Sequence, residues 1–194
     1  MGRKETADVA TRPIVTWPDA ILKRKCVPVV DFDPALVTLL EDMRETMADA
    51  EGLGLAANQV GEPLRLFLMG QPLDPERSEL EVVEVINPTI EARRGEIKYE
   101  EGCLSFPEIY QQVLRAEEVD VRFVDRHGVE QRRTFRDLPS VCFQHELDHL
   151  DGITFLDRLS PLKRRLALRA YNRSLRQRTE DERDELQALV RGPR

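Results

Sequence analysis

Two of the three histidines in the chain, His145 and His149, lie four residues apart in the segment QHELDHLDG, with Glu146 next to the first. On a helix, residues four apart share one face and lie about 6 Å from each other. Two imidazoles placed in this way can bind one metal ion, and the neighbouring glutamate can reach a water molecule on that ion. A solvated helix with two surface histidines would show the same spacing. The pattern predicts a helix at this point and favours a metal site over that alternative.

A metal site of this type requires a third protein ligand, and the sequence narrows the choice. A metzincin protease would carry a third histidine where this chain has Phe155, and the remaining histidine, His127, lies in a predicted turn. A thermolysin-like site would use a glutamate further along the chain. The acidic residues there belong to a charged run, TEDERDE, that is typical of a solvated segment. Cysteine is therefore the favoured third ligand.

The chain has three cysteines and no CxxC pair. Cys142 shares the helical face of the histidines, but its Cα would lie about 10 Å from that of His149, too far for both to bind one ion at about 2.0–2.3 Å. We interpret Cys142 as a small apolar wall residue, and Cys26, which has no partner motif, as inert. Cys103 lies in a glycine-containing loop, YEEGCLSFP, that can direct a thiolate inward. Cys103 is thus the preferred partner of the two histidines.

The hydrophobic pattern predicts an α+β fold. Asp33 and Pro34 indicate the start of a helix of about 16 residues that ends near Gly52. Its apolar side would contain Leu36, Leu39, Leu40, Met43 and Met47. Residues 64–135 hold short alternating or β-branched stretches, LRLFLMG, EVVEVINP and EVDVRFVD, that predict strands. DRHG is the expected hairpin turn, and QPLDPERSE an expected surface loop.

Two helices follow the predicted strands. Ser140 is the expected N-cap of the helix that carries the histidines, which would end near Asp151 with Gly152 as its stop. Ser160 and Pro161 would open a last helix. The expected apolar side of that helix contains Leu162, Leu166, Leu168, Tyr171 and Leu175. This order predicts antiparallel or mixed β-sheets surrounding a central HExxH-bearing helix, with an N-terminal and a C-terminal helix.

Length and composition limit the classes of protein that remain. The 194 residues fit one domain, which we place at residues 13–178, with a polar tail at 1–12 and a charged tail at 179–194. The net charge of −7 excludes a globally basic nucleic-acid binder, so no DNA partner is expected. There is no apolar run of about 18 residues and no signal peptide. We therefore expect no membrane partner. Since three cysteines cannot all pair, we expect a cytoplasmic protein.

Three segments in this order resemble peptide deformylases of the bacterial type: GLGLAANQ at residues 52–59, EGCLS at 101–105 and QHELDH at 144–149. With their flanks they cover residues 13–165. The resemblance implies a metal-dependent hydrolase that removes the formyl group from the N-terminal formyl-methionine of newly synthesised proteins. Metal-bound hydroxide would attack the formyl carbonyl, because the metal lowers the pKa of its water toward neutrality. N-formylmethionyl nascent peptides are then the expected substrates.

The resemblance assigns the metal centre to Cys103, His145 and His149, and the role of general acid and base to Glu146. It implies one Fe²⁺ per chain, with Zn²⁺, Ni²⁺ or Co²⁺ able to replace it. A thiolate with two imidazoles also suits zinc, so the ligand set alone does not select iron.

The resemblance further implies how the substrate is held. Gln59 and the backbone N–H of Leu104 would stabilise the oxyanion, and Gly54 would lie along the substrate backbone. Side chains near the three motifs would line an apolar slot for methionine: Leu53, Leu138, Val141 and Cys142. Tyr110 stands where many bacterial members carry arginine at the substrate mouth, so the chain departs from the family pattern there.

Two other functions fit the HExxH pattern, a non-catalytic metal-stabilised domain and an HExxH metalloprotease. Structural zinc sites normally have four protein ligands, and the protease would lack its third histidine.

A last expectation concerns Arg158 and the basic residues from Lys163 to Arg178. Steps of three and four residues place several of these arginines on one face of the C-terminal helix. Ribosome contact through RNA phosphates would use this stripe, and a solvated, salt-bridged helix is the alternative.

Overall fold

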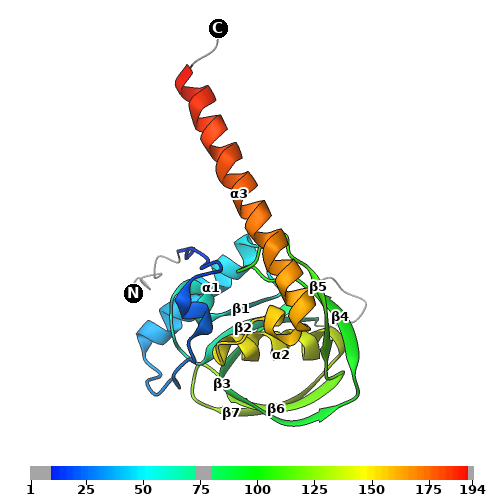
Figure 1. Ribbon diagram of the computed structural model, residues 1–194. Helices are drawn as coiled ribbons and strands as arrows, with labels where there is room; N and C mark the ends of the chain where they lie inside the picture. The colour runs from blue at the N-terminus through cyan, green and yellow to red at the C-terminus, as the bar shows by residue number, and fades with distance from the viewer. Residues whose placement is uncertain (1–9, 73–79, 192–194) are drawn as a thin grey trace, which may run out of the picture.

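The computed structural model describes residues 10–72 and 80–191, which form two antiparallel sheets and three α-helices (Figure 1). The larger sheet has the strand order β1-β2-β3-β6-β7, and β4 pairs with β5 in the smaller sheet. The strands are β1 (Gly54–Ala56), β2 (Leu66–Pro72), β3 (Leu80–Arg94), β4 (Ile97–Glu101), β5 (Gln111–Arg115), β6 (Glu118–Val124) and β7 (Glu130–Arg136). The helices are α1 (Pro34–Asp49), α2 (Asp137–Leu150) and α3 (Pro161–Arg191), with short 3₁₀ helices at Ala20–Lys23, Ala57–Val60 and Phe155–Arg158.

Helix α2 is the centre of the fold and lies inside the curve of the larger sheet, against β1, β2, β6 and β7 (Figure 1). Its Phe143 packs edge-on against Phe67 of β2, with 5.2 Å between ring centroids. Every residue of α2 from Ser140 to Leu150 is buried. A helix buried all round must find partners for its polar side chains, because an unpaired buried polar group is costly. The central helix and its antiparallel surroundings confirm the predicted fold class.

The start of α2 differs from the prediction, and its end agrees. The helix begins at Asp137, so Ser140 lies in the first turn, where its hydroxyl donates to the carbonyl of Ala116 at 2.9 Å instead of capping the helix. Pro139 is accommodated because first-turn N–H groups have no intrahelical acceptor. Gly152, the predicted stop, has a φ of 70°, a left-handed conformation that glycine adopts without strain.

Helix α1 begins as the sequence predicts. The side chain of Asp33 accepts a hydrogen bond from the N–H of Leu36 at 3.0 Å, and Pro34 is the first helical residue. The five predicted apolar residues are all buried against β1 and β2. The helix ends at Asp49 rather than near Gly52, which leaves the following residues free to form the turn into β1.

The N-terminal end of the described chain is attached to α1. The N–H of Ala10 donates to Asp42 at 3.1 Å, and that of Arg12 donates to Thr46 at 2.8 Å. Residues 10–12 of the expected tail therefore contact the domain.

The predicted strands correspond to β2, β3, β6 and β7, and the DRHG segment forms the turn between the last two, with Gly128 N–H donating to Asp125 at 2.9 Å. Most of the expected QPLDPERSE loop, residues 73–79, lies outside the described residues. Strands β1, β4 and β5 were not predicted, because they have only three to five residues and little apolar alternation.

Helix α3 packs on the domain at its N-terminal part and then extends away from it (Figure 1). The hydroxyl of Tyr171 donates to the carbonyl of Trp17 at 2.8 Å, and its ring lies 5.4 Å from that of Phe106. The helix continues to Arg191, well into the segment expected to be a charged tail.

The predicted apolar side of α3 is wrong for three of its five residues. Leu162, Leu166 and Leu175 are exposed, whereas Tyr171 is buried as predicted, together with Ala167, which was not predicted. The small side chain of Ala167 permits close approach to the domain, and this contact determines which face is covered. No helix among the described residues is both long and apolar enough to cross a membrane.

Candidate metal centre

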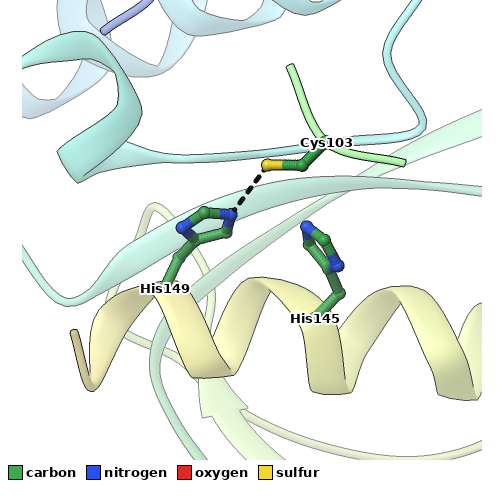
Figure 2. A group of neighbouring side chains, drawn as sticks. All are labelled: Cys103, His145 and His149. Atoms are coloured by element: carbon green, nitrogen blue, oxygen red, sulfur yellow. Dashed lines mark hydrogen bonds between the residues drawn. The ribbon is translucent and has the colours of Figure 1, made fainter. Parts of the chain in front are cut away.

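The three predicted metal ligands come from two elements. His145 and His149 lie one turn apart on α2, and Cys103 lies in the turn that follows β4 (Figure 2). This turn is closed by a hydrogen bond from the N–H of Phe106 to the carbonyl of Cys103 at 2.9 Å, and Phe106 is buried in the core. The sulfur is thereby held over the helix face from which both rings project (Figure 2).

The geometry of the three side chains suits one ion. Their ligand atoms all lie within 4.8 Å of one another, and this is the one such cluster among the residues described. Sγ of Cys103 is 3.2 Å from Nε2 of His149. Ligand atoms on one tetrahedral ion, each at about 2.0–2.3 Å from it, are separated by about 3.5 Å. Small movements of the side chains would therefore close the site around a metal.

The two histidines have different electrostatic surroundings. Burial lowers the pKa of His149, and the nearby His145 lowers it further. Burial also opposes protonation of His145, but its hydrogen bonds with Cys103 and Glu101 outweigh burial and raise its pKa. The surroundings of His145 thus favour a cationic group at this position. A divalent cation fits this position, because these donors bind metals in their deprotonated forms.

A buried ionic network supports His145 from behind. Oε2 of Glu101 lies 2.8 Å from Nδ1 of His145, which leaves Nε2 to face the triad. Arg115 donates to both oxygens of Glu101, at 2.7 and 2.9 Å, and to Asp148 at 2.5 Å. Arg158, beyond the helix, also donates to Asp148 at 2.9 Å. A carboxylate on the outer nitrogen of a metal-binding histidine fixes the ring orientation.

The charge state of this network is set by its mutual contacts. Burial opposes ionisation of Glu101, but its hydrogen bonds with Arg115 and His145 outweigh burial and lower its pKa to about 2. The side chains of Glu101 and Arg115 are each only 3% exposed.

The residues of this supporting network were not predicted from the sequence. Glu101 and Asp148 lie within the motifs EGCLS and QHELDH, so a carboxylate within two residues of a predicted ligand was the available signal. Arg115 lies on β5, which was not predicted, and carried no such signal.

Glu146 faces the cavity beside the triad without a partner. Its Oε2 is buried and makes no hydrogen bond within the described part of the chain. Burial raises the pKa of Glu146 to about 7, although the charge on His145 opposes the shift. A Cβ on Gly54 would lie 2.4 Å from Oε1 of Glu146, so only glycine leaves room for the carboxylate. A carboxyl group with a pKa near neutrality is suited to proton transfer.

The side chain of Gln59 is held at both ends. Its Oε1 accepts from the N–H of Ala56 at 2.8 Å, and its Nε2 donates to Ser105 at 3.1 Å and lies 3.5 Å from the sulfur of Cys103. Ser105 in turn donates to the carbonyl of Val15 at 2.8 Å. The amide N–H groups of Gln59 are therefore fixed next to the triad.

A cavity of about 510 Å³ opens beside the triad. Its lining includes all the residues expected to contact substrate: Leu53, Gly54, Gln59, Leu104, Leu138, Val141 and Cys142. Cys142 lies outside the triad, with its sulfur 3.7 Å from the carbonyl of Leu53, as the helical spacing predicts. Cys26 is buried in the core cluster between the sheet and α2. Tyr110 also lines the cavity.

The chain matches the family described as polypeptide deformylase over residues 11–165. The chain belongs to the peptide deformylase family. A peptide deformylase of Aquifex aeolicus is 44% identical over 167 residues, covering 86% of this chain and 98% of the relative. Peptide deformylase 2 of Xanthomonas campestris pv. campestris is 45% identical over 161 residues, covering 81% of this chain and 92% of the relative.

Solved peptide deformylases share the fold. The Legionella pneumophila enzyme has a TM-score of 0.80 and 42% identity, covering 88% of this chain and 98% of that one. A Met-Ala-Ser-bound peptide deformylase of Acinetobacter baumannii has a TM-score of 0.71 and 32% identity, covering 78% of this chain and 99% of that one. Peptide deformylases are metal-dependent hydrolases that remove N-formyl groups, and this is the activity of the chain.

The chain is therefore a deformylase, and neither a non-catalytic metal-stabilised domain nor an HExxH metalloprotease. At the position of the third metzincin histidine, Phe155 packs into the core, with its ring 5.6 Å from that of Phe106. Its ring also lies 5.9 Å from that of His145. Phe155 thus packs against His145 and the core.

Proposed function

We propose that this deformylase hydrolyses the formyl amide with Cys103, His145 and His149 as metal ligands and Glu146 as the proton-transfer group. The observation that carries the proposal is the buried carboxylate of Glu146, whose Oε2 has no hydrogen-bond partner in the described part of the chain, in the cavity that Cys103 and His145 also line. Buried polar atoms nearly always have hydrogen-bond partners. An unpaired carboxylate oxygen at a cavity therefore indicates that its partner is the reacting molecule.

The donor set fits a divalent metal ion, with three protein ligands and an open side toward the cavity. When bound, the ion supplies a Lewis acid that activates water and polarises the formyl carbonyl. We assign Fe²⁺ as the resident ion, one per chain, with Zn²⁺, Ni²⁺ or Co²⁺ as replacements. Iron-loaded protein should lose activity in air, since iron and thiolate both oxidise, and keep it under anaerobic reducing conditions. Equally active, air-stable zinc protein would contradict the assignment of iron.

Glu146 moves the proton during hydrolysis. Its carboxylate takes the proton from the attacking water and delivers it to the leaving amine. With a pKa of about 7, both its protonated and ionised forms are accessible at neutral pH. The close approach of Gly54 leaves the carboxylate room to face the substrate amide.

Gln59 and Leu104 stabilise the oxyanion. The amide of Gln59 is held by Ala56 and Ser105, and its second N–H, which is directed at the sulfur of Cys103 in this structure, would donate to the developing charge. The backbone N–H of Leu104, next to Cys103 in the cavity wall, is the second donor. Loss of one such donor typically lowers the rate about 10²–10³-fold.

The apolar part of the cavity receives the methionine side chain. Leu53, Leu138, Val141 and Cys142 supply its walls, and Gly54 allows the peptide backbone to pass close by. The Met-Ala-Ser bound to the Acinetobacter baumannii relative has the sequence of a deformylated N-terminus, which supports this assignment.

We also propose that α3 contacts the ribosome and that the protein works in the cytoplasm on nascent chains. Arg165, Arg169, Arg173 and Arg176 are exposed, and their spacing places them on one face. Arg158 and Arg164 contribute less, because they form ion pairs with Asp148 and Asp157.

The ribosome contact is best tested by charge removal. Truncation after Leu162 would delete Ala167 and Tyr171 from the core, so it is not a clean test. A variant with the four exposed arginines changed to glutamine should lose salt-sensitive co-sedimentation with ribosomes. Equal sedimentation of the variant and the wild type would contradict the contact.

The catalytic assignment is tested by formate release from formyl-Met-Ala-Ser with metal-loaded protein. We expect turnover that a chelator abolishes and that added metal restores. Formate release by the metal-free protein at the same rate would contradict the role of the triad.

A further inference from the structure

Two buried polar atoms beside the metal centre lack a hydrogen-bond partner. They are Nδ1 of His149 and Oδ1 of Asn58, and neither atom has a partner among the residues that the structure describes. His149 is 1% exposed, and Asn58 is 0% exposed. An unpaired polar atom at this depth is costly, and nearly all such atoms in folded proteins are paired. A partner is therefore expected for each of the two atoms.

The two residues are hydrogen-bonded to each other through other atoms. Asn58 lies in the 3₁₀ helix Ala57–Val60, and its Nδ2 donates to the backbone carbonyl of His149 at 2.8 Å. This carbonyl is in the last turn of α2, where C=O groups have no N–H donor within the helix. Asn58 thus attaches the end of α2 that carries His149 to the segment that carries Gln59.

The hydrogen-bonding character of both unpaired atoms is fixed by their surroundings. Nε2 of His149 faces the sulfur of Cys103 at 3.2 Å (Figure 2). When Nε2 binds a metal ion, the ring proton lies on Nδ1, which is then a donor. The amide of Asn58 directs its NH₂ group at the His149 carbonyl, because an oxygen there would face another acceptor. Oδ1 is therefore an acceptor, and the two unpaired atoms are complementary.

The other histidine of the triad shows what such a partner does. Nδ1 of His145 lies 2.8 Å from Oε2 of Glu101. Metal-binding histidines almost always donate the N–H of their outer nitrogen to a carboxylate, a carbonyl or a water molecule, and this contact fixes the tautomer and the ring orientation. His149 requires a corresponding acceptor.

Two further buried oxygens within the described residues, Oε2 of Glu146 and Oε1 of Gln71, also lack partners. Glu146 lines the substrate cavity, and the proposed function uses its carboxylate for proton transfer. Gln71 lies on β2, opposite Glu81 of β3. Of the three candidates, Asn58 is the residue that already bonds the backbone of His149. Its Oδ1 is therefore the acceptor that fits best.

We propose that Asn58 is the positioning residue of His149, with Oδ1 accepting the Nδ1–H of the metal-binding ring directly or through one buried water molecule. The inference rests on the proposed function, in which His149 is a metal ligand. Buried water molecules typically bridge polar groups that are otherwise unpaired. The two histidine ligands are thus held differently, His145 by an ionised carboxylate and His149 by an uncharged amide.

Metal affinity tests the role of Asn58. Leucine branches like asparagine but has no hydrogen-bonding atom, so Asn58→Leu should weaken zinc binding about 10–100-fold in competition with a chromophoric chelator. Asn58→Thr keeps a hydroxyl that can both donate to the His149 carbonyl and accept a hydrogen bond, and it should lose less affinity. Wild-type affinity in Asn58→Leu, or equal losses in the two variants, would overturn the inference.

Gln144→Leu is the matched control. Gln144 is a buried amide on α2 itself, and its Nε2 donates to the carbonyls of Ala116 and Ser140 at 2.9 and 3.0 Å. The variant should lose stability in denaturant unfolding, as Asn58→Leu does, but keep the zinc affinity of the wild type. An equal fall in affinity would show that any loss of stability weakens the site, and would refute the specific role of Asn58.

NMR of the zinc-loaded protein tests the hydrogen bond itself. The wild type should show two imidazole Nδ1–H signals that exchange slowly with solvent, from His145 and His149, because both protons are buried and bonded. In Asn58→Leu the His149 signal should exchange rapidly while that of His145 remains. Rapid exchange of the His149 proton in the wild type would overturn the inference, even if Asn58→Leu does not fold.

The same spectra separate this inference from the proposed function. Zinc bound without Nε2 of His149 would contradict both. A zinc-bound His149 whose Nδ1–H exchange and zinc affinity do not change in Asn58→Leu would contradict the inference alone.

Discussion

The two sides of α2 hold their charged groups in opposite states. Behind His145, on what we call the paired side, Glu101, Arg115 and Asp148 are buried and each makes two or more hydrogen bonds or ion pairs. On the unpaired side, one oxygen of the equally buried Glu146 has no hydrogen-bond partner among the residues that the structure describes. The pKa of Glu101 is held at about 2, whereas that of Glu146 is raised to about 7. Glu101 is hydrogen-bonded to His145 and Glu146 follows it in the chain, so the pKa values of these two buried carboxylates differ because of their surroundings.

This difference in pKa gives the two carboxylates different roles. A paired, permanently ionised carboxylate can orient His145 but cannot exchange protons at neutral pH. An unpaired buried carboxylate with a pKa near neutrality can exchange protons, but its ionised form lowers the stability of the fold. On the proposed function, the paired side therefore fixes the metal ligand His145, and the unpaired side is left free for substrate.

The largest effect is expected from Glu146→Gln. Glutamine keeps the shape of the side chain but cannot accept the proton, so formate release should fall about 10²–10⁴-fold. Metal content, measured on the same samples, should equal that of the wild type, because the three ligands are untouched. Near-normal turnover of the metal-loaded variant would contradict the role of Glu146 in proton transfer.

Breaking the paired side should cost stability. Arg115→Met leaves Glu101 buried without its main partner and should lower the free energy of unfolding by about 3–5 kcal/mol. Arg132→Met is the matched control, since this arginine also bridges two carboxylates, Glu91 and Glu130, but is 63% exposed. Its effect should be about 0–1 kcal/mol. Denaturant unfolding of both variants measures the difference, and equal losses would show that burial of the network is irrelevant.

The raised pKa of Glu146, on the unpaired side, should affect how the free energy of unfolding of the metal-free protein depends on pH. The pKa of Glu146 is raised from 4.5 to about 7 on folding, so its contribution to stability is complete below pH 4.5 and is lost as the pH rises through about 7. Relative to Glu146→Gln, the wild type should therefore lose up to about 3 kcal/mol between these pH values. Chelated samples of both proteins, unfolded from pH 4.5 upward, provide the test. Parallel curves would contradict the raised pKa.

A smaller effect is expected from Glu101→Gln. Removal of the charge behind His145 should weaken metal binding about 10–100-fold. Competition with a chromophoric chelator measures this affinity. Glu100→Gln, one residue earlier but exposed, is the control and should bind metal as the wild type does. Unchanged affinity in Glu101→Gln would show that the network does not act on the ligand.

The sequence predicted the parts of the fold that local patterns encode. Helix α1 was predictable from Asp33–Pro34 and its apolar spacing, and the end of α2 from Gly152. The covered face of α3 was not, because Leu162 and Ala167 compete for burial and only the shape of the domain decides between them. Strands β4 and β5 are too short and polar to show a period of two, and they are held by pairing with each other.

The candidate site was predictable where residues form a motif along the chain. The spacing of His145 and His149 and the exclusion of Cys142 follow from helix geometry. Arg115 was not predictable, because its contacts with Glu101 and Asp148 join residues 14 and 33 positions away. Such contacts depend on the tertiary fold, as does the absence of any partner for Glu146.

The central claim is that one thiolate and two imidazoles, from Cys103, His145 and His149, hold the metal. X-ray absorption at the edge of the bound metal, in the wild type and in Cys103→Ser and Cys142→Ser, tests this claim most directly. We expect one sulfur and two imidazole nitrogens in the wild type and in Cys142→Ser, and loss of the sulfur signal with weaker binding in Cys103→Ser. A sulfur signal that persists in Cys103→Ser, or that disappears in Cys142→Ser, would contradict the account.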